Sequence, residues 1–240
     1  MQIIKVKNYE ALSKEAAKIV GNLLKSKPDA ILGLATGSTP VGMYQNLVKM
    51  NEDHEISFKA VKSYNLDEYC DLPRSHGQSY YTFMHENLFN HVDISEKNVH
   101  LPHAEGADLA KQCAEYNKAL NNVKIDLQVL GIGGNGHIGF NEPGTPFSNE
   151  TFIVELTEKT REDNQRFFAS LEEVPHRAMT MGIKNIMAAK KILLLASGKN
   201  KAQAIKELVF GNVSEKFPAS ALKDHDNVIV IIDDDAASLL

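Results

Sequence analysis

The segment IDLQVLGIGGNGHIGFNEP, residues 125 to 143, carries most of the information on the fold. Its first six residues are mostly apolar and of strand length, and five glycines follow before Pro143 ends the segment. Asn135, His137, Asn141 and Glu142 lie among or just after these glycines. Glycine lets the backbone approach a ligand closely, and a histidine on such a loop is well placed for proton transfer. The segment therefore predicts a buried strand that leads into a loop with acid/base chemistry.

Strand-like and helix-like patterns alternate on both sides of this segment. We expect strands at 2–6, 30–35, 61–66, 99–101, 125–130, 153–156, 178–181, 192–196 and 228–232, and helices at 9–25, 80–89, 109–120, 160–169 and 202–210. A further helix should open with Pro40 at its first position, where the missing N–H costs nothing. The alternation predicts an α/β fold with a three-layer, Rossmann-like open sheet, mostly parallel, with helices on both faces. No repeat or long linker interrupts it, so we expect one domain over residues 1–240.

Four polar clusters follow predicted strands. They are TGSTP at 36–40, NLDEY at 65–69, the glycine-rich loop at 133–143, and SGKNKA at 197–202. In open parallel sheets, ligands bind beyond the carboxyl ends of the strands. We therefore expect the four clusters to converge on one site. The acidic run at 233–235 also follows a strand, and we interpret it as a solvated strand end.

The first and last clusters are candidates for binding an anion. Gly37, Ser38 and Thr39 lie between a strand and a helix, where free N–H groups and the helix dipole attract negative charge. Plain helix capping by the two hydroxyl residues explains the pattern equally well. The Gly-Lys-Ser/Thr of a nucleotide-binding loop is missing, which favours a small phosphate ester. Considered alone, Lys201 and Arg166 are expected to be ordinary solvent-exposed surface residues. A bound sugar phosphate, however, would give both side chains an anionic partner.

Two further positions are candidates for acid/base work. Asp67 follows a strand and is either a general base or a carboxylate that caps a loop. His137 lies five residues before Glu142, and a carboxylate partner would orient the imidazole and make it more basic. The alternative is an ordinary loop histidine. The density of glycine around it favours catalysis.

Two motifs are misleading. The glycines at 134, 136 and 139 match the dinucleotide fingerprint G-x-G-x-x-G, which requires a helix to open at the third glycine. Here Phe140 to Pro143 follow, so we expect no helix and no nicotinamide cofactor. His100 and His103 form an H-x-x-H pair, but Pro102 lies between them and no further ligands are apparent. We read both as loop residues and predict no metal site.

Composition excludes several other classes of function. The net charge of −5 gives no sign of a nucleic-acid partner. No apolar run approaches the roughly 20 residues that span a bilayer, and the N-terminus lacks the apolar region of a signal peptide. The two cysteines, Cys70 and Cys113, are far apart in the sequence and indicate no disulfide framework, which fits a reducing compartment. These features predict a cytoplasmic protein without a membrane partner.

Together, GLATGSTP, NLDEY, GGNGHIGFNEPG, NQRFF and SGKNKA, in this order from Leu32 onward, resemble the glucosamine-6-phosphate deaminase family. The resemblance implies conversion of D-glucosamine 6-phosphate and water to D-fructose 6-phosphate and ammonia, with neither an organic cofactor nor a metal. The wider superfamily leaves two alternatives open, a 6-phosphogluconolactonase and a non-catalytic sugar phosphate sensor. Sensors of this kind carry a DNA-binding segment ahead of the fold, whereas the first strand here is expected at residue 2.

The resemblance also implies a role for each candidate residue. Asp67 would take a proton from C2 of the sugar and return it at C1. His137 would assist ring opening, with Glu142 orienting it. The phosphate-binding residues would be Gly37, Ser38, Thr39, Arg166 and Lys201.

The chain departs from some members of that family at two places. Asn135 stands where they carry an aspartate, so the proton relay should depend more on Glu142. Phe152 and Val154 occupy the positions of the arginine and lysine with which allosteric hexameric members bind N-acetylglucosamine 6-phosphate. We therefore expect no such activation and a monomer or small homo-oligomer. The charged stretch 149–173 is the segment expected to form a lid.

Overall fold

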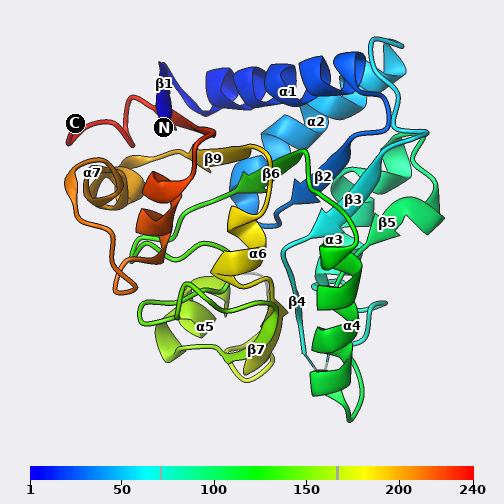
Figure 1. The fold of residues 1–240 in the computed structure, drawn as a ribbon, viewed down its shortest axis with the longest axis vertical. Coiled ribbons are helices and arrows are strands. Elements are labelled where there is room, and N and C mark those ends of the chain that lie inside the picture. Colours follow the sequence, from blue (N-terminus) through cyan, green and yellow to red (C-terminus); the bar gives the residue numbers. More distant parts are fainter. Residues whose placement is uncertain (71, 166–167) are drawn as a thin grey trace.

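The computed structural model describes residues 1–70, 72–165 and 168–240. A seven-stranded sheet forms its centre, with the strand order β1-β10-β9-β6-β2-β3-β5 and every neighbouring pair parallel. Helices pack on both of its faces (Figure 1). The predicted three-layer fold is confirmed.

The elements follow the predicted order. The strands of the central sheet are β1 (Gln2–Val6), β2 (Ile31–Leu34), β3 (Lys62–Asn65), β5 (Val99–His100), β6 (Leu127–Leu130), β9 (Ile192–Ala196) and β10 (Val228–Asp233). The helices are α1 (Tyr9–Ser26), α2 (Ser38–Glu52), α3 (Tyr80–Asn87), α4 (Leu109–Asn121), α5 (Glu158–Asn164), α6 (Ile183–Met187) and α7 (Ala202–Phe210).

Alternation along the strands divides the core into two layers. In β9, Leu193 and Leu195 face a layer built from α1, α2 and α3. Ile192 and Leu194 face the opposite layer, built from α4, α6 and α7. Strands covered on both faces need apolar residues at nearly every position, and β9 is buried throughout. This explains why the central strands read as continuous apolar runs.

Three strands lie outside the central sheet, which corrects the expectation of a single sheet. β4 (Asp67–Tyr69), β8 (Arg177–Thr180) and β7 (Phe152–Glu155) form a small antiparallel sheet in the order β4-β8-β7. Only Leu66 separates β3 from β4, and its carbonyl accepts a hydrogen bond from the Met181 N–H at 2.7 Å. The chain therefore passes directly from one sheet to the other. Apolar pattern alone does not reveal such a transfer, because all three strands are short.

Some helix boundaries also differ from the prediction. α2 begins at Ser38, so Pro40 is its third residue and not its first. The first four N–H groups of a helix lack intrahelical partners, so a proline is tolerated at either position. α5 begins at residue 158 instead of 160, because Thr157 caps its start. The structure assigns the helix up to residue 164, and residues 166–167 of the predicted range lie outside the described residues. α6 was not predicted, since five residues are too few to show helical periodicity.

Among the helices of the described ranges, the longest is α1, with 18 residues. None of those helices combines the length and the apolar character that crossing a membrane requires.

Candidate active site

The four predicted polar clusters follow four strands that are neighbours in the sheet, β9, β6, β2 and β3. From β2 the chain proceeds to β3 and β5 on one side, and from β6 to β9 and β10 on the other. The boundary between β2 and β6 is thus a topological switch point, where the connecting loops diverge and leave a crevice. The predicted convergence of the clusters is confirmed.

A cavity of about 240 Å³ lies at this crevice. Six of the predicted site residues line it: Gly37, Ser38, Thr39, Asp67, His137 and Lys201. Asn135 and Glu142 stand behind His137, and Arg166 lies outside the described residues. The volume is below that of a typical pocket for a drug-sized ligand, so the site suits one small molecule and not a dinucleotide.

One wall of the cavity can bind an anion. Gly37 has φ +92° and forms the N-cap of α2, which carries no acidic residue in its first turn. The free N–H groups of this helix end therefore face the cavity together with the side chains of Ser38 and Thr39. Lys201 lines the same cavity from the start of α7.

The segment that carries Lys201 is anchored by Asp233, at the end of β10. The Asp233 carboxylate accepts hydrogen bonds from the Ser197 hydroxyl and from the Gly198 N–H, the latter at 3.0 Å. Asp233 is buried, so the interpretation of the acidic run as a solvated strand end is wrong for this residue. Sequence reasoning missed it because a run of three aspartates is usually solvent-exposed.

The carboxylate of Asp67 lies at the junction of the two sheets. It is buried, and within the described part of the chain no group donates a hydrogen bond to it. Burial, and secondarily the negative charge of Glu68, raise the pKa of Asp67 to about 8. A carboxyl group with a pKa near the working pH is suited to both taking up and releasing a proton.

The neighbouring Glu68 has a different role. Its carboxylate accepts hydrogen bonds from the N–H groups of Tyr69, Tyr80 and Tyr81, each at 2.9 Å. Two of these N–H groups belong to the first turn of α3, where they lack intrahelical partners. Glu68 therefore fixes α3 to β4, while the adjacent Asp67 faces the cavity.

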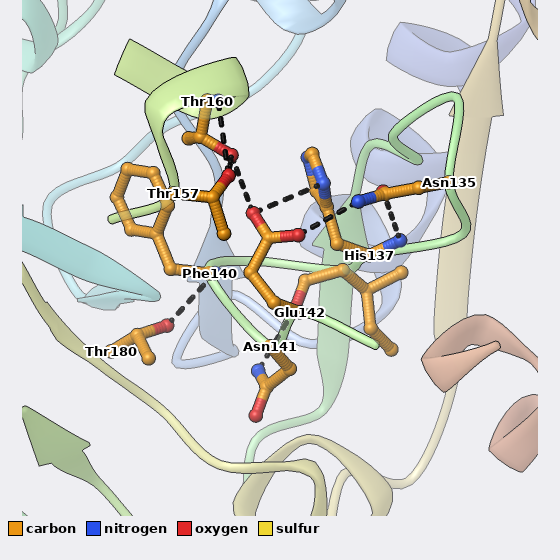
Figure 2. Close-up of polar contacts among 9 residues, drawn as sticks. Asn135, His137, Phe140, Asn141, Glu142, Thr157, Thr160 and Thr180 are labelled. Atoms are coloured by element: carbon orange, nitrogen blue, oxygen red, sulfur yellow. Dashed lines mark hydrogen bonds and ion pairs between the residues drawn. The ribbon is translucent and has the colours of Figure 1, made fainter. Parts of the chain in front are cut away.

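Figure 2 shows how the glycine-rich loop presents its polar residues. His137 Nδ1 lies 3.6 Å from Glu142 Oε1, and Asn135 donates a hydrogen bond to Glu142 Oε2 at 2.7 Å. The side-chain oxygen of Asn135 also accepts a hydrogen bond from the His137 N–H at 3.2 Å. Asn135 is thus hydrogen-bonded to both members of the pair, and the predicted contact between His137 and Glu142 is present.

Glu142 is held in its ionised form. Burial on its own would raise the pKa of Glu142, but its interactions with His137, Thr160 and Asn135 outweigh burial and lower it to about 2. The two carboxyl groups of the site therefore differ in protonation near neutral pH. Such a separation is how one site provides an acid/base group and a permanent negative charge together.

Two of the glycines are required by these contacts. A Cβ atom on Gly133 would lie 2.3 Å from the His137 ring, so only glycine lets the imidazole fold back over the loop. Gly139 has φ +57°, and a Cβ there would come within 3.0 Å of Thr180 Oγ1 and 3.4 Å of Asp67 Oδ2. No helix opens after Gly139, as predicted when the dinucleotide fingerprint was rejected.

Residues 5–231 match the model of the family described as glucosamine-6-phosphate isomerases/6-phosphogluconolactonase. The chain belongs to this family. A protein of Clostridium novyi (strain NT) named glucosamine-6-phosphate deaminase is 53% identical to it over 241 residues, with both chains covered in full. A solved structure of a monomeric glucosamine-6-phosphate deaminase is 46% identical, with a TM-score of 0.98 and full coverage of both chains.

Solved structures of lower sequence identity share the fold. The 6-phosphogluconolactonase of Thermotoga maritima superimposes with a TM-score of 0.77 at 20% identity, over 97% of this chain and 99% of its own. At that identity the comparison establishes the architecture only.

Sequence reasoning missed three residues that line the cavity. Tyr80 lines the cavity with its ring stacked on Phe140, and Thr160 and Asn164 line it from α5. Thr160 also donates a hydrogen bond to Glu142 Oε1 at 2.6 Å. The spacing Thr157-x-x-Thr160 signals a capped helix start, but nothing in the sequence indicates that the helix faces Glu142.

The two histidines of the H-x-x-H pair differ, because only His103 lies in a loop as predicted. His100 belongs to β5 and stacks on Tyr64 with ring centroids 4.4 Å apart, so it is not a loop residue. Across the residues whose positions are described, no group of three histidine, cysteine or acidic side chains is arranged to hold a metal ion.

Proposed function

We propose that this protein is a glucosamine-6-phosphate deaminase, which converts D-glucosamine 6-phosphate and water to D-fructose 6-phosphate and ammonia. One observation carries the proposal. Two separate acid/base groups, Asp67 and the His137–Glu142 pair, face one cavity whose wall also includes the N-terminus of α2. Hydrolysis of a lactone needs one base to activate water, whereas this reaction needs proton transfer at two places on the sugar. The naming of relatives at about 53% identity supports the same choice.

Ring opening is the first task. A pyranose has no acidic hydrogen at C2 until the ring opens to an aldehyde. We assign His137 to this step, because it lines the cavity and its side chain is 30% exposed there. It carries a proton from the anomeric hydroxyl to the ring oxygen. Glu142 remains ionised and stabilises the imidazolium that forms during the transfer.

Isomerisation is the second task, and we assign it to Asp67. The carboxylate removes the proton from C2, and the electron pair forms the C1–C2 double bond. The electron pair of the C1=O double bond moves to O1, which takes up a proton from the substrate ammonium, and the product is an enolamine. The same proton is returned at C1, which leaves an imine at C2. Water then adds to the imine carbon and ammonia departs, giving the ketone. A substrate ammonium beside Asp67 would favour the ionised carboxylate that this step requires.

The phosphate of the substrate is remote from the reacting carbons. We place it at the N–H groups of Gly37, Ser38 and Thr39, with Lys201 as its cationic partner and Arg166 as a further one. Its binding energy then holds C1 and C2 between the two acid/base groups.

We further propose that the enzyme acts as a monomer or small oligomer in the cytoplasm, without a nucleic-acid partner. The high similarity to a monomeric deaminase supports the first point. Phe152 and Val154, in β7, offer no positive charge to an anionic effector. We therefore expect hyperbolic kinetics that N-acetylglucosamine 6-phosphate does not change. A sigmoidal rate curve relieved by that compound would contradict this expectation.

The function is tested by measuring ammonia and fructose 6-phosphate released from glucosamine 6-phosphate by purified protein, without added cofactor. Both products should appear in equal amounts. Hydrolysis of 6-phosphogluconolactone without ammonia release would support the lactonase instead. Binding of sugar phosphates without turnover of either substrate would support the sensor.

A further inference from the structure

Helix α5 contacts the ring-opening pair through Thr160. Thr160 is buried, and its hydroxyl donates a hydrogen bond to Glu142 Oε1 at 2.6 Å. The same residue lies in the first turn of α5, where its N–H donates a hydrogen bond to Thr157 Oγ1 at 3.1 Å. Figure 2 shows Thr157 and Thr160 above the Glu142 carboxylate, on the side opposite Asn141.

The direction of the hydrogen bonds follows from the charge on Glu142. An ionised carboxylate only accepts hydrogen bonds, so the one hydroxyl proton of Thr160 points to Glu142. The two threonine hydroxyls are 2.9 Å apart, and Thr157 must therefore donate to Thr160. The resulting chain runs from the cap of α5, through Thr160, to Glu142. Successive hydrogen bonds of this kind polarise and strengthen one another.

The chain also determines how the carboxylate is oriented. Asn135 holds Oε2 at 2.7 Å, and Thr160 holds Oε1 at 2.6 Å. His137 Nδ1 is farther from Oε1, at 3.6 Å. The histidine therefore does not fix the carboxylate. The carboxylate is fixed by two other donors and in turn presents Oε1 to the histidine.

We propose that Thr160 is a positioning residue of the ring-opening step, which holds Glu142 in place for His137 and links the pair to α5. This assignment rests on the proposed function. Asn164, on the same helix, lines the cavity. One wall of the cavity and the orientation of the catalytic pair are thus set by the same helix, and α5 must be in position before the pair is complete.

Thr160→Val keeps the shape of the side chain and removes only the hydroxyl. A hydrogen bond to a charged group contributes enough for a loss of about tenfold or more, so kcat should fall about tenfold while KM changes less than about twofold. Thr160→Ser retains the hydroxyl and should keep kcat within about twofold of the wild type. Wild-type kcat in the valine variant, or an equal loss in the serine variant, would overturn the assignment.

A variant of Thr157, the N-cap residue of α5, distinguishes the positioning role of Thr160 from a general destabilisation of the helix. Thr157→Ala removes the cap of the helix but leaves Thr160 its bond to Glu142. It should lower the melting temperature while reducing kcat clearly less than Thr160→Val does. An equal loss of kcat in both variants would show that stability of the helix, and not the bond to the carboxylate, is what matters.

A double-mutant cycle with Glu142→Gln gives a readout that misfolding cannot imitate. In the Glu142→Gln background, Thr160→Val should change kcat less than about twofold, because the charged carboxylate that Thr160 positions is no longer present. The same tenfold loss in both backgrounds would refute the positioning role. Ammonia release by the wild type decides the proposed function separately. A wild type that releases none refutes the function, and an active wild type matched by Thr160→Val refutes this inference alone.

Discussion

Replacing Asp67 by asparagine should nearly abolish turnover and at the same time stabilise the protein. The change keeps the size of the side chain and removes the ability to take up the C2 proton. General-base catalysis typically contributes a factor of about 10² to 10⁴, so we expect kcat to fall at least about 100-fold. Binding of the substrate phosphate involves other residues, so inorganic phosphate should inhibit both proteins similarly.

The gain in stability follows from the raised pKa of Asp67, which is about 8 in the folded protein against an ordinary value of 3.8. Between these two values the folded chain keeps a proton that the unfolded chain has lost, so the free energy of unfolding falls as the pH rises. At pH 7 the difference spans about 3 pH units, and at about 1.4 kcal/mol per unit the ceiling is about 4 kcal/mol. Asparagine carries no such penalty.

Thermal unfolding of both proteins from pH 4 to pH 8 tests this reasoning. The variant should melt higher at pH 7, by up to about 10 °C for a chain of this size, and the two should nearly coincide at pH 4. Asp126→Asn is the matched control. Asp126 is a buried carboxylate paired with Lys27 and Lys190, and the amide should destabilise the protein at pH 7. A constant difference between wild type and Asp67→Asn across the pH range would refute the account, as would near-normal turnover.

Four further results are expected from kinetics. His137→Gln should lower kcat with little change in KM, and the open-chain alcohol 2-amino-2-deoxyglucitol 6-phosphate should still inhibit it as well as it inhibits the wild type. Lys201→Met should raise KM for glucosamine 6-phosphate about tenfold, since a charge-assisted contact to phosphate is lost, while kcat changes less. In the wild type, kcat/KM should rise with pH up to about 8 as Asp67 ionises. Glu68→Gln should move that rise to lower pH, because the charge of Glu68 contributes to the raised pKa; an unshifted profile would argue against Asp67 as the group that titrates.

The central sheet and most of the site were predictable because they depend on local patterns. Apolar runs of strand length alternate with helical stripes, and each polar cluster directly follows a run, so the convergence of Asp67, His137 and Lys201 follows from the topology of parallel sheets. The segment containing β4, β7 and β8 was not predictable in the same way. Its strands are three or four residues long, and their pairing depends on contacts between segments far apart in sequence.

The contacts that orient the residues of the site could not be predicted from the sequence either. Glu68 follows Asp67 directly, and pattern alone does not distinguish the residue that faces the cavity from the one that caps α3. Thr160 lies 18 residues after Glu142, in a segment whose charge suggested only a lid. The lid itself stays a prediction.

The pairing of β1 with β10 has a consequence for how the chain folds. Gln2 lies opposite Ile229 in the sheet, and Lys5 forms an ion pair with Asp234 at 3.4 Å, so the two ends of the chain lie near one another in Figure 1. During synthesis, β1 has no partner in the sheet until residues 228–233 have left the ribosome. Because β1 and β10 lie side by side, joining the ends shown by a short linker and opening the chain at another surface loop should give a circular permutant that keeps the order of the central sheet.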